Sequence, residues 1–87
     1  MGVYIDTTRT PYGRMFMSHM IADSLNELHR MAKCIGIRRK WFQDKSVPHY
    51  DICQSKKVLA LKKFGAHEID RRTFVEIMQV IRKRRLR

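Results

Sequence analysis

The stretch Ser24–Gly36, SLNELHRMAKCIG, carries the clearest structural signal in the chain. Ser24 and Glu27 have the spacing of a capping box, in which the serine oxygen accepts a hydrogen bond from the third helical N–H and the glutamate reaches back. Apolar side chains then recur at helical spacing as far as Ile35, and Gly36 is a residue type that commonly follows a helix end. The stretch therefore predicts an amphipathic helix, around which the other elements are placed.

Short extended segments are expected on both sides of this helix. Residues 3–6, VYID, are β-branched and aromatic and predict a strand, whereas residues 7–13 contain proline and glycine and predict a loop. Periodicity leaves open whether residues 15–22 form a strand or a helix. Residues 43–50 are expected to be a loop, and residues 66–69 a short strand.

Two further helices are expected in the second half of the chain. One covers about residues 55–64 and ends before Gly65, and it is expected to bury Val58, Leu61 and Phe64. The other begins after the capping residue Asp70 and has one apolar stripe, made of Phe74, Ile77, Met78 and Ile81.

The order strand, helix, helix, strand, helix favours an α/β fold. We expect a small single-layer sheet of short strands packed with about three helices. The chain is short enough for one compact domain over residues 1–81, with residues 82–87 as a basic C-terminal tail that continues the last helix.

The composition is that of a small globular protein. Of 87 residues, 44% are hydrophobic and 31% are charged, which is too apolar for a disordered tail. No apolar run reaches the roughly 18 residues that span a bilayer, and the N-terminus lacks the pattern of a secretory signal. Cys34 and Cys53 do not make a disulfide framework. These features argue against a secreted miniprotein or a membrane span, and we expect a cytoplasmic protein.

The chain is strongly basic, since 19 Lys and Arg against 8 Asp and Glu give a formal net charge of +11. Such a surface attracts polyanions, because each neutralised phosphate releases condensed counterions. We therefore expect nucleic acid, DNA or RNA, to be bound by the basic clusters, which comprise Arg38, Arg39, Lys40, Lys56, Lys57, Arg82, Lys83, Arg84, Arg85 and Arg87. The alternative is that these clusters are only solvated, because cations at a helix end are favourable without a ligand.

The segment Arg38–Phe42 places two aromatic side chains directly after three cations. Trp41 and Phe42 are expected to anchor the core, because a small domain needs its few large apolar groups there. The alternative is that they stack on exposed bases while the neighbouring cations hold phosphates.

A few acidic residues lie at the ends of predicted elements. A cluster of Asp6, Asp23 and Asp51 would suit Mg²⁺ or Mn²⁺, which neutralise phosphate charge and orient water. His19, His29 and His49 are candidates for a general base or a softer metal ligand, although His29 is expected to be a half-buried packing residue. Asp6, His49 and Asp51 are thus the candidate catalytic residues for phosphodiester cleavage. In the structural alternative, Asp23 only caps a helix and Asp6 only closes a turn.

Short motifs follow one another in order along the chain as far as about residue 73. They include YID at 4–6, GR at 13–14, SHMIAD at 18–23, ELH at 27–29, WFQ at 41–43 and HYDI at 49–52. Together they resemble a small, uncharacterised bacterial and phage family, the domain of unknown function numbered four thousand and thirty-one. The resemblance implies a grouping and no established activity, and the basic tail lies outside it.

A second resemblance is to PIN-like nucleases. In that family a strand ends in an acidic residue, as at Asp6, and a later acid precedes a helix, as at Asp51. The resemblance implies a metal held by these two residues and completed by Asp23 or His49. The chain is shorter than such a domain normally is, and it lacks an obvious fourth carboxylate.

The sequence thus predicts a small basic nucleic-acid-binding protein of phage or bacterial origin. Two alternatives stay open. One is a metal-dependent nuclease or phosphoesterase with a carboxylate–histidine site, and the other is an adaptor or inhibitor that docks an acidic host protein. A domain with so small a core could also pair with a second copy as a homodimer.

Overall fold

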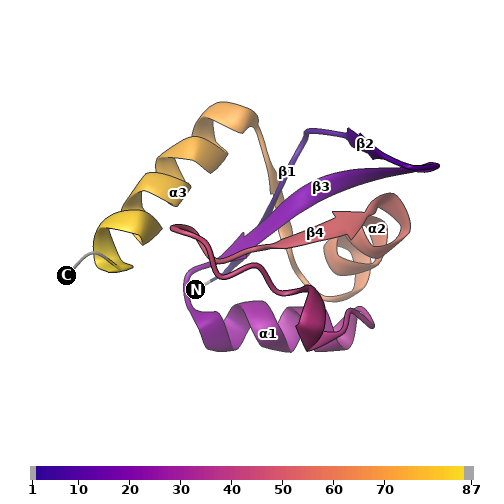
Figure 1. Cartoon of the computed structure of the whole chain (residues 1–87), viewed down its shortest axis with the longest axis horizontal. Helices are drawn as coiled ribbons and strands as arrows, with labels where there is room; N and C mark the ends of the chain where they lie inside the picture. The colour runs from indigo at the N-terminus through magenta and orange to yellow at the C-terminus, as the bar shows by residue number, and fades with distance from the viewer. Residues whose placement is uncertain (1, 86–87) are drawn as a thin grey trace.

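The computed structural model describes residues 2–85, in which five strands form one mixed sheet and three helices pack around it (Figure 1). The strands are β1 Val3–Asp6, β2 Thr10–Tyr12, β3 Met15–Ala22, β4 Tyr50–Cys53 and β5 His67–Ile69. The helices are α1 Leu25–Cys34, α2 Gln54–Lys63 and α3 Arg71–Arg85, with a short 3₁₀ turn, η1, at Arg39–Trp41. The expected α/β class is confirmed.

The eight-residue strand β3 organises the sheet. Its beginning pairs antiparallel with β2, its end pairs antiparallel with β1, and β4 pairs antiparallel along it. Strand β5 adds to β1 in parallel, with Tyr4 opposite His67. These several partners explain why residues 15–22 are a strand, the assignment that periodicity alone left open. The sequence-based expectation missed β4, which pairs with β3 from a distant part of the chain.

A β-hairpin joins β2 to β3 where a loop was expected. Tyr12 pairs with Met15, which leaves Gly13 and Arg14 as the two-residue connection. Gly13 has φ of +60°, the value that a type II′ turn requires at its first central position. Pro11 lies in β2, which is an edge strand, and there its missing N–H is tolerated. The loop prediction for residues 7–13 is therefore wrong for β2.

The helix ends follow the predicted signals. The Glu27 N–H donates to Ser24 Oγ at 3.2 Å, which is the expected capping contact of α1. Gly36 has φ of +80° just beyond the end of α1, a left-handed conformation that favours glycine. At the start of α3 the Thr73 N–H donates to Asp70 Oδ1 at 3.0 Å, so the predicted cap is present there too.

The sheet buries apolar side chains on both faces. On one face Ile5, Met20 and Ile52 join a core cluster with residues of α1 and α2. On the other face Ile21 packs against the predicted stripe of α3, of which Phe74 and Ile81 are buried and Ile77 and Met78 are partly buried. In Figure 1, α1 lies below the sheet and α3 lies above one end of it.

Helix α2 presents a different face to the core from the one expected. Val58 and Phe64 are exposed, whereas Ala60 is fully buried and Leu61 packs against the core only in part. The expected apolar face is therefore wrong at two of its three positions.

One of the buried side chains of α2 is charged, that of Lys57. Lys57 is only 6% exposed. Its ammonium group donates to the main-chain carbonyl of Asp6 at 3.0 Å and lies 2.6 Å from a carboxylate oxygen of Glu68. Lys57 thus connects α2 to both β1 and β5, and this need for polar partners fixes the rotation of the helix.

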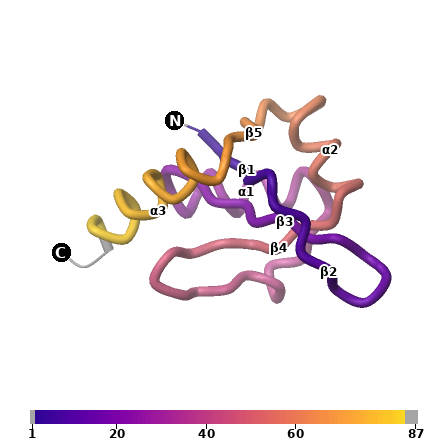
Figure 2. The backbone as a smooth tube through the Cα atoms, turned by 90° about the horizontal axis from the view of Figure 1, so that it is seen from above, coloured from indigo at the N-terminus to yellow at the C-terminus, as the bar shows by residue number. Residues whose placement is uncertain are grey.

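Figure 2 shows the β2–β3 hairpin and the C-terminal end of α3 at opposite ends of the molecule. Within residues 2–85, none of the helices combines the length and the apolar composition that crossing a bilayer requires.

Candidate functional site

Asp6, His19 and Asp51 form one row across three neighbouring strands. His19 of β3 is directly opposite Asp51 of β4 in the strand register, and the His19 N–H donates to Asp6 Oδ1 at 3.0 Å. Side chains alternate between the faces of a sheet, and Tyr4 and Ile21, two positions from Asp6 and His19, pack toward α3. The row therefore lies on the face that α3 covers in part.

His49 joins this row from the residues just before β4. Its Nε2 is 3.8 Å from Asp51 Oδ1, and its ring centroid is 5.9 Å from that of His19. We call Asp6, His19, His49 and Asp51 the acid–histidine cluster. It brings together the three candidate catalytic residues and the histidine that was considered with them as a base.

Asp6 is the most buried member of the cluster, with 3% of the residue exposed. Its Oδ2 accepts hydrogen bonds from the Thr8 hydroxyl and, at the same distance of 2.8 Å, from His19 Nδ1. Burial works against ionisation of Asp6, but the hydrogen bonds from His19 and Thr8 outweigh it and lower the pKa of the carboxyl group. Asp6 is therefore an ionised carboxylate that holds the His19 ring in place.

The pKa of His19 is shifted in the opposite direction to that of Asp6. The hydrogen bond to Asp6 raises the pKa of the imidazole, burial opposes this, and the negative charges of Asp6 and Asp51 add to the increase. Because a carboxylate only accepts, the Nδ1 atom of His19 carries a proton, and Nε2 faces away from Asp6. Nε2 is the atom of this ring that is left for chemistry.

Asp51 is held on one side only. Its Oδ2 accepts a hydrogen bond from Gln43 Nε2 at 2.8 Å. Its Oδ1 is buried and has no hydrogen-bond partner, and lies 3.7 Å from His19 Nε2 and 3.8 Å from His49 Nε2. A buried carboxylate oxygen without a donor is costly, so this position needs a positive charge or a proton nearby.

A pocket of about 350 Å³ opens beside the cluster. Asp6, His19 and His49 line it, together with the cations Lys45 and Arg71 and apolar side chains of α3. The pocket therefore combines imidazole groups with positive charge, which suits a small anionic group such as a phosphate.

A larger groove of about 700 Å³ has Asp51 in its lining. We call it the basic–aromatic groove and define it by the side chains Tyr12, Arg38, Lys40, Trp41 and Lys56, which line it together with Asp51. Trp41 is 59% exposed and Tyr12 is 69% exposed.

These exposures correct the expectation for Trp41. It lies in the groove and does not anchor the core, whereas Phe42 is partly buried, packs against the core cluster and places its ring 4.6 Å from that of His29. The Lys40 ammonium lies 5.3 Å from the centre of the Trp41 ring, within the range of a cation–π contact. The ring is thus presented to solvent beside positive charge.

The predicted phosphate-binding residues fall into two separate regions. Arg38, Lys40 and Lys56 line the groove, and Arg39 is exposed on η1 beside them. Lys57 does not join them, because its ammonium group is buried against Asp6 and Glu68.

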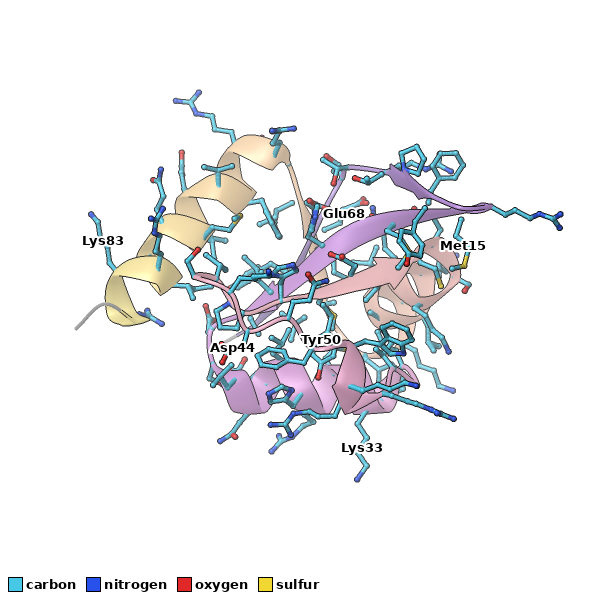
Figure 3. The ribbon with its side chains drawn as sticks, viewed as in Figure 1. Met15, Lys33, Asp44, Tyr50, Glu68 and Lys83 are labelled. Atoms are coloured by element: carbon cyan, nitrogen blue, oxygen red, sulfur yellow. The ribbon has the colours of Figure 1, made fainter. Side chains whose placement is uncertain are left out.

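The second region is the end of α3. Arg82, Lys83 and Arg84 are exposed there, Arg85 ends the helix, and Arg87 lies outside the described residues. Lys83 and Met15, which lies near the groove, are at opposite ends of the molecule (Figure 3).

The three carboxylates proposed for Mg²⁺ or Mn²⁺ do not converge. Asp23 follows the far end of β3, where its N–H donates to the Gly2 carbonyl and its Oδ2 accepts from the Tyr4 hydroxyl, each at 3.0 Å. Gly2 and Asp6 are four residues apart on extended chain, which is roughly 13 Å. Asp6 and Asp51 lie at opposite nitrogens of the His19 ring. The carboxylate set therefore does not fit such an ion. Nor, among residues 2–85, do three or more His, Cys, Asp or Glu side chains form a ready-made metal-binding group.

The sequence reasoning did not anticipate the residues that hold the cluster in place. Thr8, Gln43 and the carbonyl oxygen of Val47, which is 2.9 Å from His49 Nδ1, are its hydrogen-bond partners. For two members of the cluster itself, the HYDI motif at 49–52 indicates proximity, because alternation along an extended chain puts the side chains of His49 and Asp51 on one face.

Comparison with known proteins identifies a family and no activity. No curated protein and no solved structure matches the chain, so nothing there supports the PIN-like resemblance. Residues 3–81 match the family described as protein of unknown function (DUF4031), a span that includes the acid–histidine cluster, the basic–aromatic groove and every strand of the described sheet. The chain is therefore a member of this DUF4031 family.

Proposed function

We propose that the protein binds single-stranded nucleic acid along the basic–aromatic groove. Arg38, Lys40 and Lys56 contact phosphates, and a base stacks on the ring of Trp41. The observation that carries this proposal is the exposure of Trp41, 59%, among cations that line the same groove. An aromatic ring held in solvent beside positive charge is the arrangement by which proteins hold unpaired bases, and stacking contributes roughly 1–3 kcal/mol per base.

Charge and shape support the same partner. The formal net charge of +11 favours a polyanion of any kind, whereas the aromatic side chains Tyr12 and Trp41 favour one with exposed planar groups. A duplex keeps its bases stacked inside, so we expect it to bind through charge alone and more weakly. This function agrees with the expected cytoplasmic location, where nucleic acid is plentiful.

The test is fluorescence anisotropy of labelled single-stranded DNA, single-stranded RNA and duplex DNA over a series of salt concentrations. We expect Trp41→Ala to weaken single-strand binding roughly 5- to 150-fold, the equivalent of about 1–3 kcal/mol. Val58→Ala is the matched control, because Val58 is also half exposed but does not line the groove. Poly-glutamate serves as a polyanion without bases. If it binds as tightly as DNA and Trp41→Ala has no effect, the proposal fails in favour of an acidic protein partner.

Phosphodiester hydrolysis is a second candidate function, and one observation favours it. Asp51 lines the groove, and its Oδ1 also lies 3.7 Å from His19 Nε2 and 3.8 Å from His49 Nε2. A strand bound in the groove would thus pass the acid–histidine cluster. In this function Asp6 positions His19, and His19, His49 and Asp51 contact the attacking water. Gel analysis of labelled RNA and DNA, with and without added Mn²⁺ or Zn²⁺, should show products that His49→Ala abolishes while leaving strand binding intact.

A further inference from the structure

At the acid–histidine cluster one carboxylate oxygen, Asp51 Oδ1, lies close to a ring nitrogen of each histidine. Asp51 Oδ1 is buried and lacks a hydrogen-bond partner, and the Nε2 atoms of His19 and His49 lie 3.7 and 3.8 Å from it. These separations are longer than hydrogen bonds, so Asp51 Oδ1 is hydrogen-bonded to neither ring.

The hydrogen bonds on the far side of each ring fix this orientation. His19 Nδ1 is 2.8 Å from Asp6 Oδ2, and His49 Nδ1 is 2.9 Å from the carbonyl oxygen of Val47. A carboxylate and a carbonyl oxygen can only accept, so each Nδ1 carries a proton. In the neutral rings both Nε2 atoms then present lone pairs toward the Asp51 carboxylate.

We propose that His19 Nε2, His49 Nε2 and Asp51 Oδ1 bind one divalent transition-metal ion of the Zn²⁺ class. Two imidazoles and one carboxylate are a donor set that such ions prefer, whereas Mg²⁺ prefers oxygen ligands only. An ion at about 2.0–2.2 Å from each donor in tetrahedral geometry sets the donors roughly 3.4 Å apart. Both separations from Asp51 Oδ1 are slightly longer than this. Among residues 2–85 no three such side chains already form a metal-binding group, so the site is not preassembled and binding requires the side chains to move together.

The surrounding contacts are those that support a metal site. Histidine ligands commonly donate the other ring N–H to a carboxylate or a backbone carbonyl, which fixes the ring and makes the ligating nitrogen more basic. Here Asp6 accepts the hydrogen bond from His19 Nδ1, and the Val47 carbonyl accepts the one from His49 Nδ1. Gln43 donates to the second oxygen of Asp51. Each of the three ligands is thus oriented by its own partner.

The site is reachable and leaves room for a further ligand. The His19 side chain is 42% exposed and that of Asp51 is 37% exposed, and the 350 Å³ pocket lies directly beside both histidines. Lys45 and Arg71 in that pocket favour an anionic group, such as a phosphate oxygen, at the open coordination position. This inference does not rest on nucleic-acid binding.

The test is isothermal titration of the chelator-treated full chain, free of nucleic acid, with Zn²⁺, Mn²⁺ and Mg²⁺. We expect one Zn²⁺ per chain, weaker Mn²⁺ binding and no Mg²⁺ binding, in the order set by these ligands. Co²⁺ provides a second readout, because coordination by the two histidines changes its visible absorption spectrum. His49→Ala and Asp51→Asn should each weaken Zn²⁺ binding roughly 100-fold or more, and Asp6→Asn, which acts through His19, roughly 10- to 100-fold.

His67→Ala is the matched control, because His67 is exposed on β5, outside the cluster. Circular dichroism of each variant checks that it is folded, and Asp51→Asn preserves the shape of the side chain. The proposal is overturned if no Zn²⁺ binds at micromolar concentration, or if His67→Ala weakens binding as much as His49→Ala. It is also overturned if the cluster only takes up a proton, which an NMR titration of the His19 and His49 rings would show. Nucleic-acid binding is measured separately in chelator, so either proposal can fail alone.

Discussion

The Lys57 ammonium lies 2.6 Å from a carboxylate oxygen of Glu68, although the lysine side chain is 8% exposed and the glutamate side chain 44%. The cation is thus buried while its anionic partner remains half in water. The lysine also donates to the carbonyl oxygen of Asp6, so it has a second partner inside the protein.

This asymmetry predicts unequal effects of removing the two partners. Lys57→Met leaves the Asp6 carbonyl unpaired and should lower the free energy of unfolding by about 1–3 kcal/mol. Glu68→Gln should cost less than this, because the glutamate side chain is half exposed and the amide oxygen that replaces its carboxylate can still accept a hydrogen bond from Lys57. Urea unfolding at pH 7 measures both. Equal costs would show that the ion pair, and not the hydrogen bond to Asp6, holds α2 to the sheet.

Trp41 and Phe42 are adjacent in sequence and should respond differently to truncation. Phe42 packs against the core, so Phe42→Ala should lower the free energy of unfolding by about 3 kcal/mol, the low end of the range for phenylalanine. Trp41→Ala should change stability by less than about 0.5 kcal/mol, because the side chain is mainly exposed. Thermal or urea unfolding of the two variants compares them directly. A large loss of stability in Trp41→Ala would contradict its placement in the groove.

The two basic regions should contribute differently to nucleic-acid binding. Changing Arg38, Lys40 and Lys56 to Gln removes the same charge as changing Arg82, Lys83 and Arg84 to Gln. The groove variant should reduce the slope of log affinity against log salt by roughly 2–3, about 0.7–0.9 for each lost phosphate contact. The variant in α3 should reduce it less, because the C-terminal end of α3 and the β2–β3 hairpin beside the groove lie at opposite ends of the molecule (Figure 2). Equal reductions would indicate binding by net charge alone, without the groove.

His29 should make stability depend on pH. Burial lowers its pKa, and the charge of Arg39 lowers it further, while its Nδ1 lies 2.8 Å from the Tyr50 hydroxyl. The unfolded chain, with an ordinary pKa of about 6.5, therefore binds a proton more readily than the folded protein does. This contribution to stability is present at neutral pH and is lost as pH falls below about 6.5.

The measurement compares the parent protein with His29→Gln by urea unfolding at pH 7.5 and at pH 5.5. The stability difference in favour of the parent should be larger at the higher pH. His19 serves as an internal contrast, because its pKa is raised and its contribution has the opposite sign. A difference that grows toward low pH would mean that His29 is protonated in the folded protein.

Local signals predicted much of the backbone. The cap at Ser24, the cap at Asp70 and the glycine after α1 are decided by neighbouring residues, and all three are present as expected. Strand β4 and hairpin strand β2 were missed because both depend on pairing with β3, a contact between segments that the local sequence does not encode. The face of α2 was mistaken for a related reason, since the partners of Lys57 come from two other strands.

In the candidate site, too, local sequence indicated some residues, whereas contacts between distant segments could not be predicted. Asp6, His49 and Asp51 could be selected because acids are few in so basic a chain, Asp6 follows a predicted strand, and His49 lies two residues before Asp51. That His19 stands between the two acids follows from the register of three strands, and a shift of one residue would turn it to the opposite face. Asp23 lies apart from the cluster, beside Gly2 and Tyr4 at the start of β1, and distance along the sequence does not show this separation.

The pairing of β1 with β5 has a consequence during synthesis of the chain. Tyr4 is made early, whereas its partner His67 is among the last residues of the sheet to be made. At about 5–20 residues per second, the ribosome leaves this edge of β1 without its neighbour for roughly 3–13 s. An unpaired strand edge is a site of mispairing with other chains. Because of the order of translation, β1 waits for β5, the last strand, before this edge is hydrogen-bonded. A nascent chain that stops before β5 keeps that edge unpaired.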